Sequence, residues 1–163
     1  QCNGKFRNQV RQAERAGVAI RITDDYPAFW PILEQTLDGR HGVRPTHTLG
    51  EMQRIAGLFP GEIRLFGASV VGKLIAGVVT VDVTTHAVYT KYMAQDFGHQ
   101  EQRPMNLLLT EVARDCLRRG KRSLDLGVSM EEKSTHGINE GLFAFKEGFG
   151  AGAVRRESYT IEL

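Results

Sequence analysis

The chain has 163 residues, 41% of them hydrophobic and 25% charged, a balance typical of one globular domain with a single core. Its net charge of +2 does not by itself indicate a nucleic-acid-binding protein, and apolar runs such as residues 74–81 are too short to cross a bilayer. The two cysteines do not predict a disulfide framework. The sequence shows no leader of basic residues followed by an apolar run, so we expect a cytoplasmic protein. Because the first residue is Gln1, we expect a processed chain or part of a longer protein.

The first quarter of the chain predicts a helix, a strand and a second helix. Residues 4–16 are good helix formers that end at Gly17. Their apolar stripe consists of Phe6, Val10 and Ala13. Residues 18–23 alternate as a half-buried strand. Its inward side chains are expected to be Val18, Ile20 and Ile22. The next helix follows Asp24 and Asp25, with Pro27 near its start.

The middle of the chain changes to a strand pattern. A helix over 48–59 opens at Thr48 with Glu51 three residues later, which is a capping-box pattern. Three strands follow, and the first two are joined by a short turn at Val71-Gly72. Their ranges are 62–69, 73–83 and 87–94. Short connections of this kind predict an antiparallel meander.

The last third predicts a long helix between Pro104 and Gly120. Its apolar stripe is Met105, Leu108, Leu109, Val112, Ala113 and Cys116, and the residues expected to face away are Glu111, Arg114, Asp115 and Arg118. A strand over 123–129, a short helix within 139–150 and a strand over 158–163 complete the chain. The short helix is expected to present Ile138, Leu142, Phe145 and Phe149 on one face. This order predicts the α+β class, with one central, mostly antiparallel sheet flanked by helices on both faces.

Three segments give the sequence a resemblance to a known family. They are RNQVRQAERAGV (7–18), LLLTEVARDCLRRGKRSLDLGVS (107–129) and GLFAFKEGFGA (141–151). Together with the order of elements, they resemble the GNAT acyltransferase fold and, more closely, one lobe of the Fem-type aminoacyl transferases, which are built from paired GNAT-like lobes. The resemblance implies a single GNAT-like domain over 1–163, either complete or one lobe of a longer two-lobed protein.

The segment before the long helix departs from the pattern of acetyl-CoA-binding GNAT proteins. Those proteins carry a glycine-rich turn whose amides and helix N-terminus hold the pyrophosphate. Residues 100–106 here contain no glycine, Pro104 removes one amide and Glu101 adds a negative charge. Fem-type lobes also lack this turn, because their donor is an aminoacyl-tRNA. Both acyl-CoA and aminoacyl-tRNA therefore stay open as donor substrates, and no further cofactor is expected.

A lysine among phenylalanines is the first candidate for chemistry. In Fem-type enzymes an aromatic–lysine pair in this segment lies near the transferred acyl group, and the resemblance places that pair at Phe145-Lys146. Lys146 would be a cation where negative charge develops on a carbonyl oxygen. The alternative is that Phe145 is a core residue and Lys146 faces solvent. Tyr92, near the end of a strand, is a candidate acid for the leaving group, or a packed ring with its hydroxyl at the surface.

The remaining candidates lie around the same predicted cleft. Arg103 and Asn106, at the start of the long helix, are candidates for a phosphate contact or for helix capping. Ser129 is expected to face the acyl-binding cleft, whereas Asp125 could line it, bind backbone or pair with Arg122. His136 is a candidate base or a surface histidine. The five histidines show no metal-ligand spacing, so no metal site is predicted.

The sequence therefore predicts an N-acyltransferase that passes an acyl or aminoacyl group to an amine. The resemblance implies a small-molecule or peptidoglycan-precursor amine as acceptor. Basic residues on the first helix and at the end of the long helix could bind phosphates, which keeps tRNA as a candidate partner. Two alternatives stay open, a binding lobe that has lost its chemistry and an acyl-CoA-dependent acetyltransferase with an unusual pyrophosphate loop. Cys116 is a poor nucleophile candidate, because it lies on an apolar stripe.

Overall fold

A five-stranded sheet forms the centre of the molecule, and its strands follow one another in chain order. The computed structural model describes residues 2–130, 137–154 and 159–161. The strands are β1 (Ala19–Thr23), β2 (Ile63–Val70), β3 (Lys73–Asp82), β4 (Ala87–Gln95) and β5 (Ser123–Asp125). Neighbouring strands from β1 through β4 pair antiparallel, and β5 pairs parallel to β4. The predicted meander and the α+β class are confirmed.

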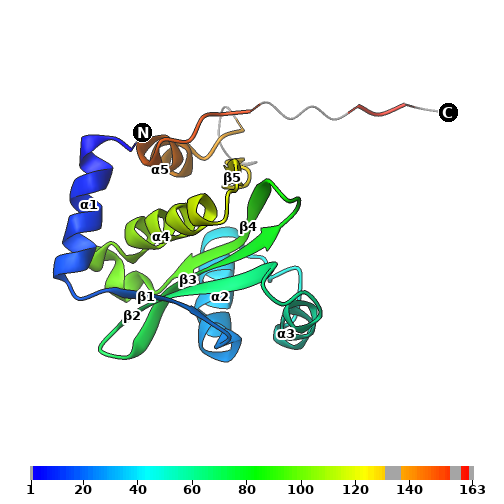
Figure 1. Cartoon of the computed structure of the whole chain (residues 1–163), viewed down its shortest axis with the longest axis horizontal. Coiled ribbons are helices and arrows are strands. Elements are labelled where there is room, and N and C mark those ends of the chain that lie inside the picture. Colours follow the sequence, from blue (N-terminus) through cyan, green and yellow to red (C-terminus); the bar gives the residue numbers. More distant parts are fainter. Residues whose placement is uncertain (1, 131–136, 155–158, 162–163) are drawn as a thin grey trace.

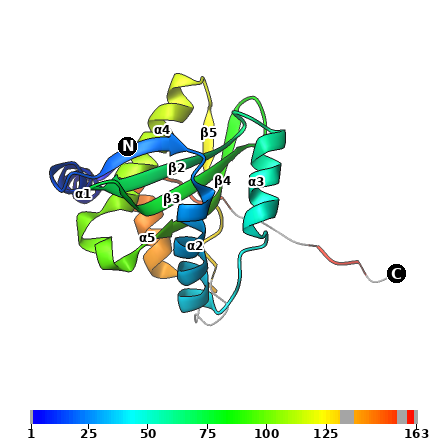
Figure 2. The same cartoon turned by 90° about the horizontal axis from the view of Figure 1, so that it is seen from below.

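Helices cover both faces of this sheet (Figure 1). One face carries α1 (Gly4–Arg15), α4 (Pro104–Arg118) and α5 (Glu140–Phe149). The other carries α2 (Tyr26–His41) and α3 (Leu49–Leu58), which Figure 2 shows in front of the strands. A short 3₁₀ helix, η1 (Phe97–Gln102), leads from β4 into α4. We call these two sides the α4 face and the α2 face.

Each face has its own hydrophobic cluster. On the α4 face, Phe6 and Val10 of α1 pack with Leu108 and Val112 of α4 over the strands. On the α2 face, the cluster consists of Tyr26, Phe29, Trp30, Leu33, Met52, Leu65, Val79, Tyr92 and Ala94. Burial of these apolar side chains supplies the main drive for folding, and it fixes α5 and α2 on opposite sides of the sheet.

Several local predictions are confirmed because short-range chemistry decides them. The Thr48 side chain accepts from the Glu51 amide, and the Glu51 carboxylate accepts from the Thr48 amide, which completes the capping box of α3. Val71 and Gly72 both have positive φ, at 49° and 78°, in the turn between β2 and β3. That geometry suits the twist of a two-residue hairpin. Gly17 and Gly120 follow α1 and α4 with φ of 74° and 72°.

Four predictions about position are wrong. Ile22 is 54% exposed, because it lies on a short edge strand that has a neighbour on one side only. Asp115 is buried and paired with arginines, although a helical wheel places it on the polar side of α4. Ile138 lies before the Asn139 cap and so outside α5. Residues 159–161 are exposed and form no strand, while the other residues of the predicted strand, 158 and 162–163, lie outside the described part of the chain.

Candidate active site

A β-bulge in β4 determines which face its side chains reach. Thr80 of β3 pairs with Thr90, whereas the preceding residue Val79 pairs with Tyr92, so Lys91 is the extra residue. Such a bulge reverses the alternation of side chains beyond it. Val88, before the bulge, therefore packs on the α4 face, and Tyr92, after it, packs on the α2 face.

β4 and β5 pair over three residues only. The last pair joins Tyr89 to Asp125, and the Thr90 hydroxyl donates to the Asp125 carbonyl at 3.1 Å. The Asp125 carboxylate then accepts from the Gly127 amide at 2.7 Å, and Gly127 has a φ of 73°. This turn ends β5 after three residues, so the prediction of a strand over 123–129 is too long by four residues. We call this place, at Thr90, Asp125 and Gly127, the divergence point.

Lys146 of α5 reaches the backbone just past the divergence point. Its side chain is buried, with only 7% of the residue exposed. The Nζ donates to the carbonyl of Gly127 at 2.9 Å and to that of Val128 at 2.8 Å. A lysine ammonium has three N–H bonds, so one N–H is left over after these two hydrogen bonds to described residues. The alternative interpretation, in which Lys146 faces solvent, is therefore wrong.

Burial has an electrostatic consequence for this ammonium. Loss of hydration lowers the pKa of Lys146 from its ordinary value of 10.5, and the nearby Asp125 carboxylate opposes that shift in part. Burying a cation costs free energy unless polar groups compensate it. The two carbonyls provide that compensation, and they hold the charge next to the end of β5.

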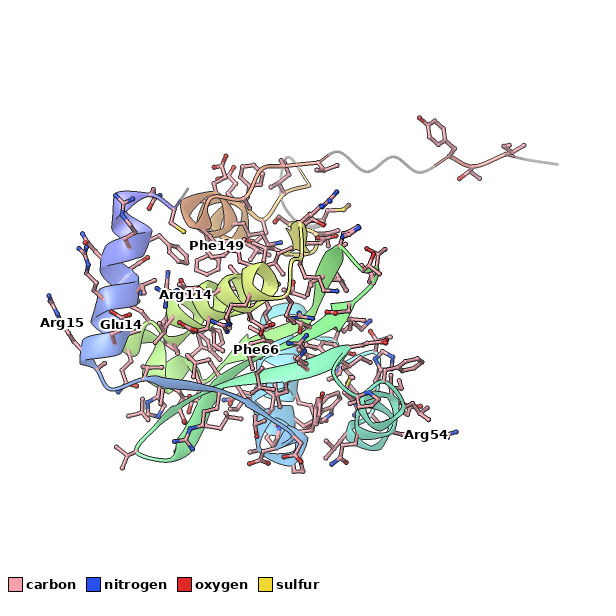
Figure 3. The ribbon with its side chains drawn as sticks, viewed as in Figure 1. Glu14, Arg15, Arg54, Phe66, Arg114 and Phe149 are labelled. Carbon is pink, nitrogen blue, oxygen red and sulfur yellow. The ribbon has the colours of Figure 1, made fainter. Side chains whose placement is uncertain are left out.

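Phe145, the neighbour of Lys146, points to a different environment. Its ring lies 5.8 Å from that of Phe6 of α1, and the Phe149 ring lies 5.3 Å from the same partner. Both phenylalanines contact the cluster on the α4 face, as predicted. Figure 3 shows Phe149 on the side of α5 that faces α1 and α4. These contacts anchor α5, so Phe145 is placed to position Lys146.

Tyr92 lies on the opposite face of the sheet from Lys146. Its ring packs edge-on against Trp30 at a centroid distance of 5.8 Å. Its hydroxyl lies 2.8 Å from His47 Nδ1 and accepts from the His47 amide at 3.3 Å. The expectation of a hydroxyl at the surface is therefore wrong, because the residue is 7% exposed and its oxygen is held by a loop between α2 and α3. The sequence drew no attention to His47, which has no motif around it.

A pocket of about 370 Å³ opens beside this tyrosine–histidine pair. Trp30 and His47 line it, together with Glu34 of α2 and Arg44 of the following loop. Its size suits a small ligand group. A larger groove of about 610 Å³ lies between α2 and strands β1 to β3, and none of the predicted site residues lines it. Volume alone therefore does not identify the site.

Side chains of α1 form hydrogen bonds with residues at the start of α4 and just before it. The buried Asn106 side chain donates to Gln9 at 3.2 Å, and Gln12 donates to the Glu101 carbonyl at 2.7 Å. Arg103 has a φ of 53°, makes no side-chain cap of α4 and lies 3.9 Å from Glu101. Asn106 therefore does not cap α4, and one N–H of its side-chain amide is bound to α1; its predicted phosphate contact stays a prediction.

The other candidates have simpler positions. Ser129 follows β5 outside any strand, is half-buried, and accepts from the Asn139 amide through its carbonyl at 3.0 Å. Asp125 binds backbone, which was one of its expected roles. His136 lies outside the described residues. Burial raises the pKa of Cys116, which keeps its thiol protonated and unsuited to attack. Within the described residues, no group of histidine, cysteine and carboxylate side chains could hold a metal ion.

With this geometry in view, comparison with known families is informative. The sequence profile of the family described as "Acetyltransferase (GNAT) domain" matches residues 2–146. The chain therefore belongs to the GNAT acetyltransferase family. No curated protein sequence matches it. Among the described helices, none combines the length and apolar character that crossing a bilayer requires.

Solved structures agree on the fold at low sequence identity. A possible acetyltransferase from Clostridium difficile 630 is 13% identical, with a TM-score of 0.68, over 90% of this chain and 97% of that one. The ribosomal-protein-alanine N-acetyltransferase from Brucella melitensis biovar Abortus 2308 is 20% identical, with a TM-score of 0.58, over 90% and 99%. FemX is 14% identical, with a TM-score of 0.73, over 91% of this chain and 54% of that one. These likenesses establish the GNAT fold, and they do not fix a substrate.

Proposed function

We propose that this chain is a Fem-like N-acyltransferase domain, which transfers an acyl or aminoacyl group to an amine. The observation that carries the proposal is the buried Lys146 ammonium beside the divergence point, with one N–H beyond its two carbonyl contacts. A fixed cation in a dry site stabilises the negative charge that develops on an acyl carbonyl oxygen. As part of this proposal, the chain acts as one GNAT-like domain, which in a two-lobed protein of the FemX type would be one of the lobes.

The reaction needs only positioning and proton transfer. The amine nitrogen attacks the acyl carbon, the bond from that carbon to the carrier breaks, and the carrier leaves with a proton while the amine loses one. Lys146 faces the acyl oxygen from the α4 face. The Tyr92–His47 pair handles the proton from the α2 face, where the pocket lined by Trp30 and Glu34 receives the amine. In this proposal the substrates meet beyond Asp125, where β4 and β5 no longer pair.

The contacts at the start of α4 favour a donor other than acyl-CoA. In CoA-binding members of this fold, free amides there hold a pyrophosphate. Here Gln9 and Gln12 of α1 bind Asn106 and the Glu101 carbonyl, and no glycine lets a phosphate approach the backbone. An aminoacyl-tRNA presents its acyl ester without requiring that cradle. The structural likeness to acetyltransferases keeps acetyl-CoA as the comparison donor.

The decisive experiment offers both donors to the purified chain. Acetyl-CoA and a radiolabelled aminoacyl-tRNA are each incubated with a short peptide that has a free lysine side chain, and label in the peptide is counted. Transfer from the aminoacyl-tRNA alone supports the proposal. Transfer from acetyl-CoA alone identifies an ordinary acetyltransferase. No transfer from either donor favours the binding lobe, for which the engagement of Lys146 with its own backbone is the supporting observation.

The Tyr92→Phe variant tests the α2 side of this site. The ring and its packing on Trp30 are kept, so the thermal unfolding temperature should change by only a few degrees. Loss of the hydroxyl should lower the transfer rate about 100-fold, the usual order for a group that moves a proton. An unchanged rate would show that this hydroxyl only fixes the His47 loop.

A further inference from the structure

The outer face of α1 concentrates the positive charge of the chain. The helix contains Lys5, Arg7, Arg11 and Arg15 and a single acidic residue, Glu14, which gives it a net charge of +3. The whole chain has a net charge of only +2. The residues outside this one helix are therefore slightly acidic in sum, so α1 carries more net positive charge than the rest of the chain together.

Three of these residues form a row along the helix. Arg7, Arg11 and Arg15 are four residues apart, which on a helix places them about 6 Å from one another along one side. The opposite side consists of Phe6, Val10 and Ala13, all buried in the core. Figure 3 shows Arg15 pointing away from the body of the molecule. We call Arg7, Arg11 and Arg15 the arginine row.

The arginine row has no carboxylate partner among the described residues. Arg7 donates to the Cys2 carbonyl at 3.2 Å and Arg11 to the Asn8 amide oxygen at 3.4 Å, both neutral acceptors. Arginines on α4 behave differently, because Arg114 and Arg118 each face a carboxylate within 4 Å. The charge of the arginine row is therefore not balanced within the described structure.

The arrangement also works against the helix that carries it. α1 has no acidic residue in its first turn, and Lys5 and Arg7 lie near its N-terminus, where the helix dipole is positive. Cations at that end weaken a helix. A departure from a local rule without a compensating contact is typical of a surface used for binding.

We propose that the arginine row binds the phosphate backbone of an RNA strand. Each guanidinium offers a planar fork that matches a phosphate, and a single row of them follows a linear polyanion. A membrane surface fits less well, because the apolar side of α1 is consumed by the core and has nothing left to insert into a bilayer.

The position of α1 joins this surface to the candidate active site. The Asn3 amide, which precedes α1, donates to the Gly148 carbonyl of α5 at 3.0 Å, and the Phe6 ring packs on Phe145. A strand lying along the arginine row toward the start of α1 therefore approaches the helix that carries Lys146. This inference rests on the proposed function in one respect, because it identifies the surface that would hold the carrier of an aminoacyl donor.

Fluorescence anisotropy with a labelled, uncharged RNA hairpin that has a single-stranded 3′ end tests the proposal. The wild type, the triple variant R7Q/R11Q/R15Q and the control triple R21Q/R54Q/K73Q are titrated at several salt concentrations. The three control residues are exposed and lie outside α1, and the control variant loses the same amount of net charge as the first triple. Figure 3 shows Arg54 at the far side of the molecule from Arg15. Because each phosphate contact contributes about 0.7 to 0.9 to the slope of log K against log salt, the first triple should lower that slope by about 2 to 3. The control should lower it by less than about 1.

Three results would overturn the proposal. Equal losses in both triples would indicate bulk charge, an unchanged first triple would exclude the arginine row, and equally tight binding to vesicles containing phosphatidylserine would indicate a lipid surface. Thermal melts of both triples check that the fold is retained. The Lys146→Met variant should bind the hairpin as the wild type does. RNA binding without any transfer would therefore contradict only the proposed function, and transfer from acetyl-CoA without RNA binding would contradict this inference.

Discussion

Replacing Lys146 with methionine is expected to lower the rate of acyl transfer by about 100- to 1,000-fold, the usual cost of removing one donor to a developing oxyanion. Methionine is also unbranched and adaptable in shape, but it carries neither charge nor N–H bonds. The carbonyls of Gly127 and Val128 lose their donor as well, so the free energy of unfolding should fall by about 1 kcal/mol for each hydrogen bond. Kinetics and urea denaturation measure these two losses separately.

Two further lysine variants make that result specific. Lys73→Met removes an exposed lysine that is 3.5 Å from Asp96, and it should leave both rate and stability close to those of the wild type. Lys146→Arg keeps a cation that does not lose its proton, so it should retain part of the activity that methionine loses. A Lys146→Met enzyme with the wild-type rate would mean that this ammonium only holds the end of β5 in place.

The pH dependence of transfer follows from the environment of the same ammonium. Burial lowers the pKa of Lys146, and Asp125 opposes the shift in part. Because the charged form faces the acyl oxygen, the rate should fall as the pH rises through a value below the ordinary 10.5 of lysine. This alkaline limb should be absent from the Lys146→Arg variant. The same limb in both enzymes would assign it to another group.

The parts of the fold that were predicted from sequence depend on neighbouring residues. The capping box joins Thr48 to Glu51, and the hairpin turn needs only Val71 and Gly72 to adopt positive φ. The order of β2, β3 and β4 in the sheet also follows from the short connections between them. In the candidate site, the aromatic–lysine segment predicted a helix that packs through Phe145 and Phe149, and the structure contains it.

What the sequence could not predict depends on partners far along the chain. Alternation alone places Tyr92 with Thr90 on one face, but the extra residue Lys91 turns Tyr92 to the other, where it meets His47. Asn106 carries no sign that Gln9 will bind it, 97 residues away. A charged residue such as Asp115 is normally exposed, and the approach of Arg64 from β2, together with the contact of Arg119, makes its burial tolerable.

The Asp115→Ala variant should destabilise the protein more than the substitution of an exposed residue does. Asp115 lies 2.8 Å from both Arg64 and Arg119, and its side chain is only 10% exposed. Removing one partner of a buried ion pair leaves the other charge uncompensated, which costs about 3 to 5 kcal/mol in well-buried cases. Since Arg119 keeps its contact with Asp82 at 2.6 Å, we expect about 2 to 4 kcal/mol, or a fall in the unfolding temperature of about 10 °C.

Glu111→Ala, one turn earlier on α4, is the matched control. Glu111 lies 2.6 Å from Arg114, which is closer than either contact of Asp115, but the arginine is 54% exposed. Exposed pairs contribute about 0 to 1 kcal/mol, so this variant should melt within a few degrees of the wild type. A similar loss in both variants would mean that distance, not burial, determines the cost, and would contradict the argument.

Acid should weaken the same cluster in a predictable direction. Burial by itself raises the pKa of Asp82, but hydrogen bonds from Arg119 and Lys121 outweigh it, and the pKa ends below its ordinary 3.8. The stabilisation from Asp82 is therefore complete above that value and is lost as the pH falls below it. Ion pairs link Arg64 of β2 to Asp115 of α4, and Arg119 links Asp115 in turn to Asp82 of β3. Because this cluster fixes the end of α4 on the sheet, and β5 follows α4 directly, loss of it should also disturb the divergence point and lower transfer together with stability.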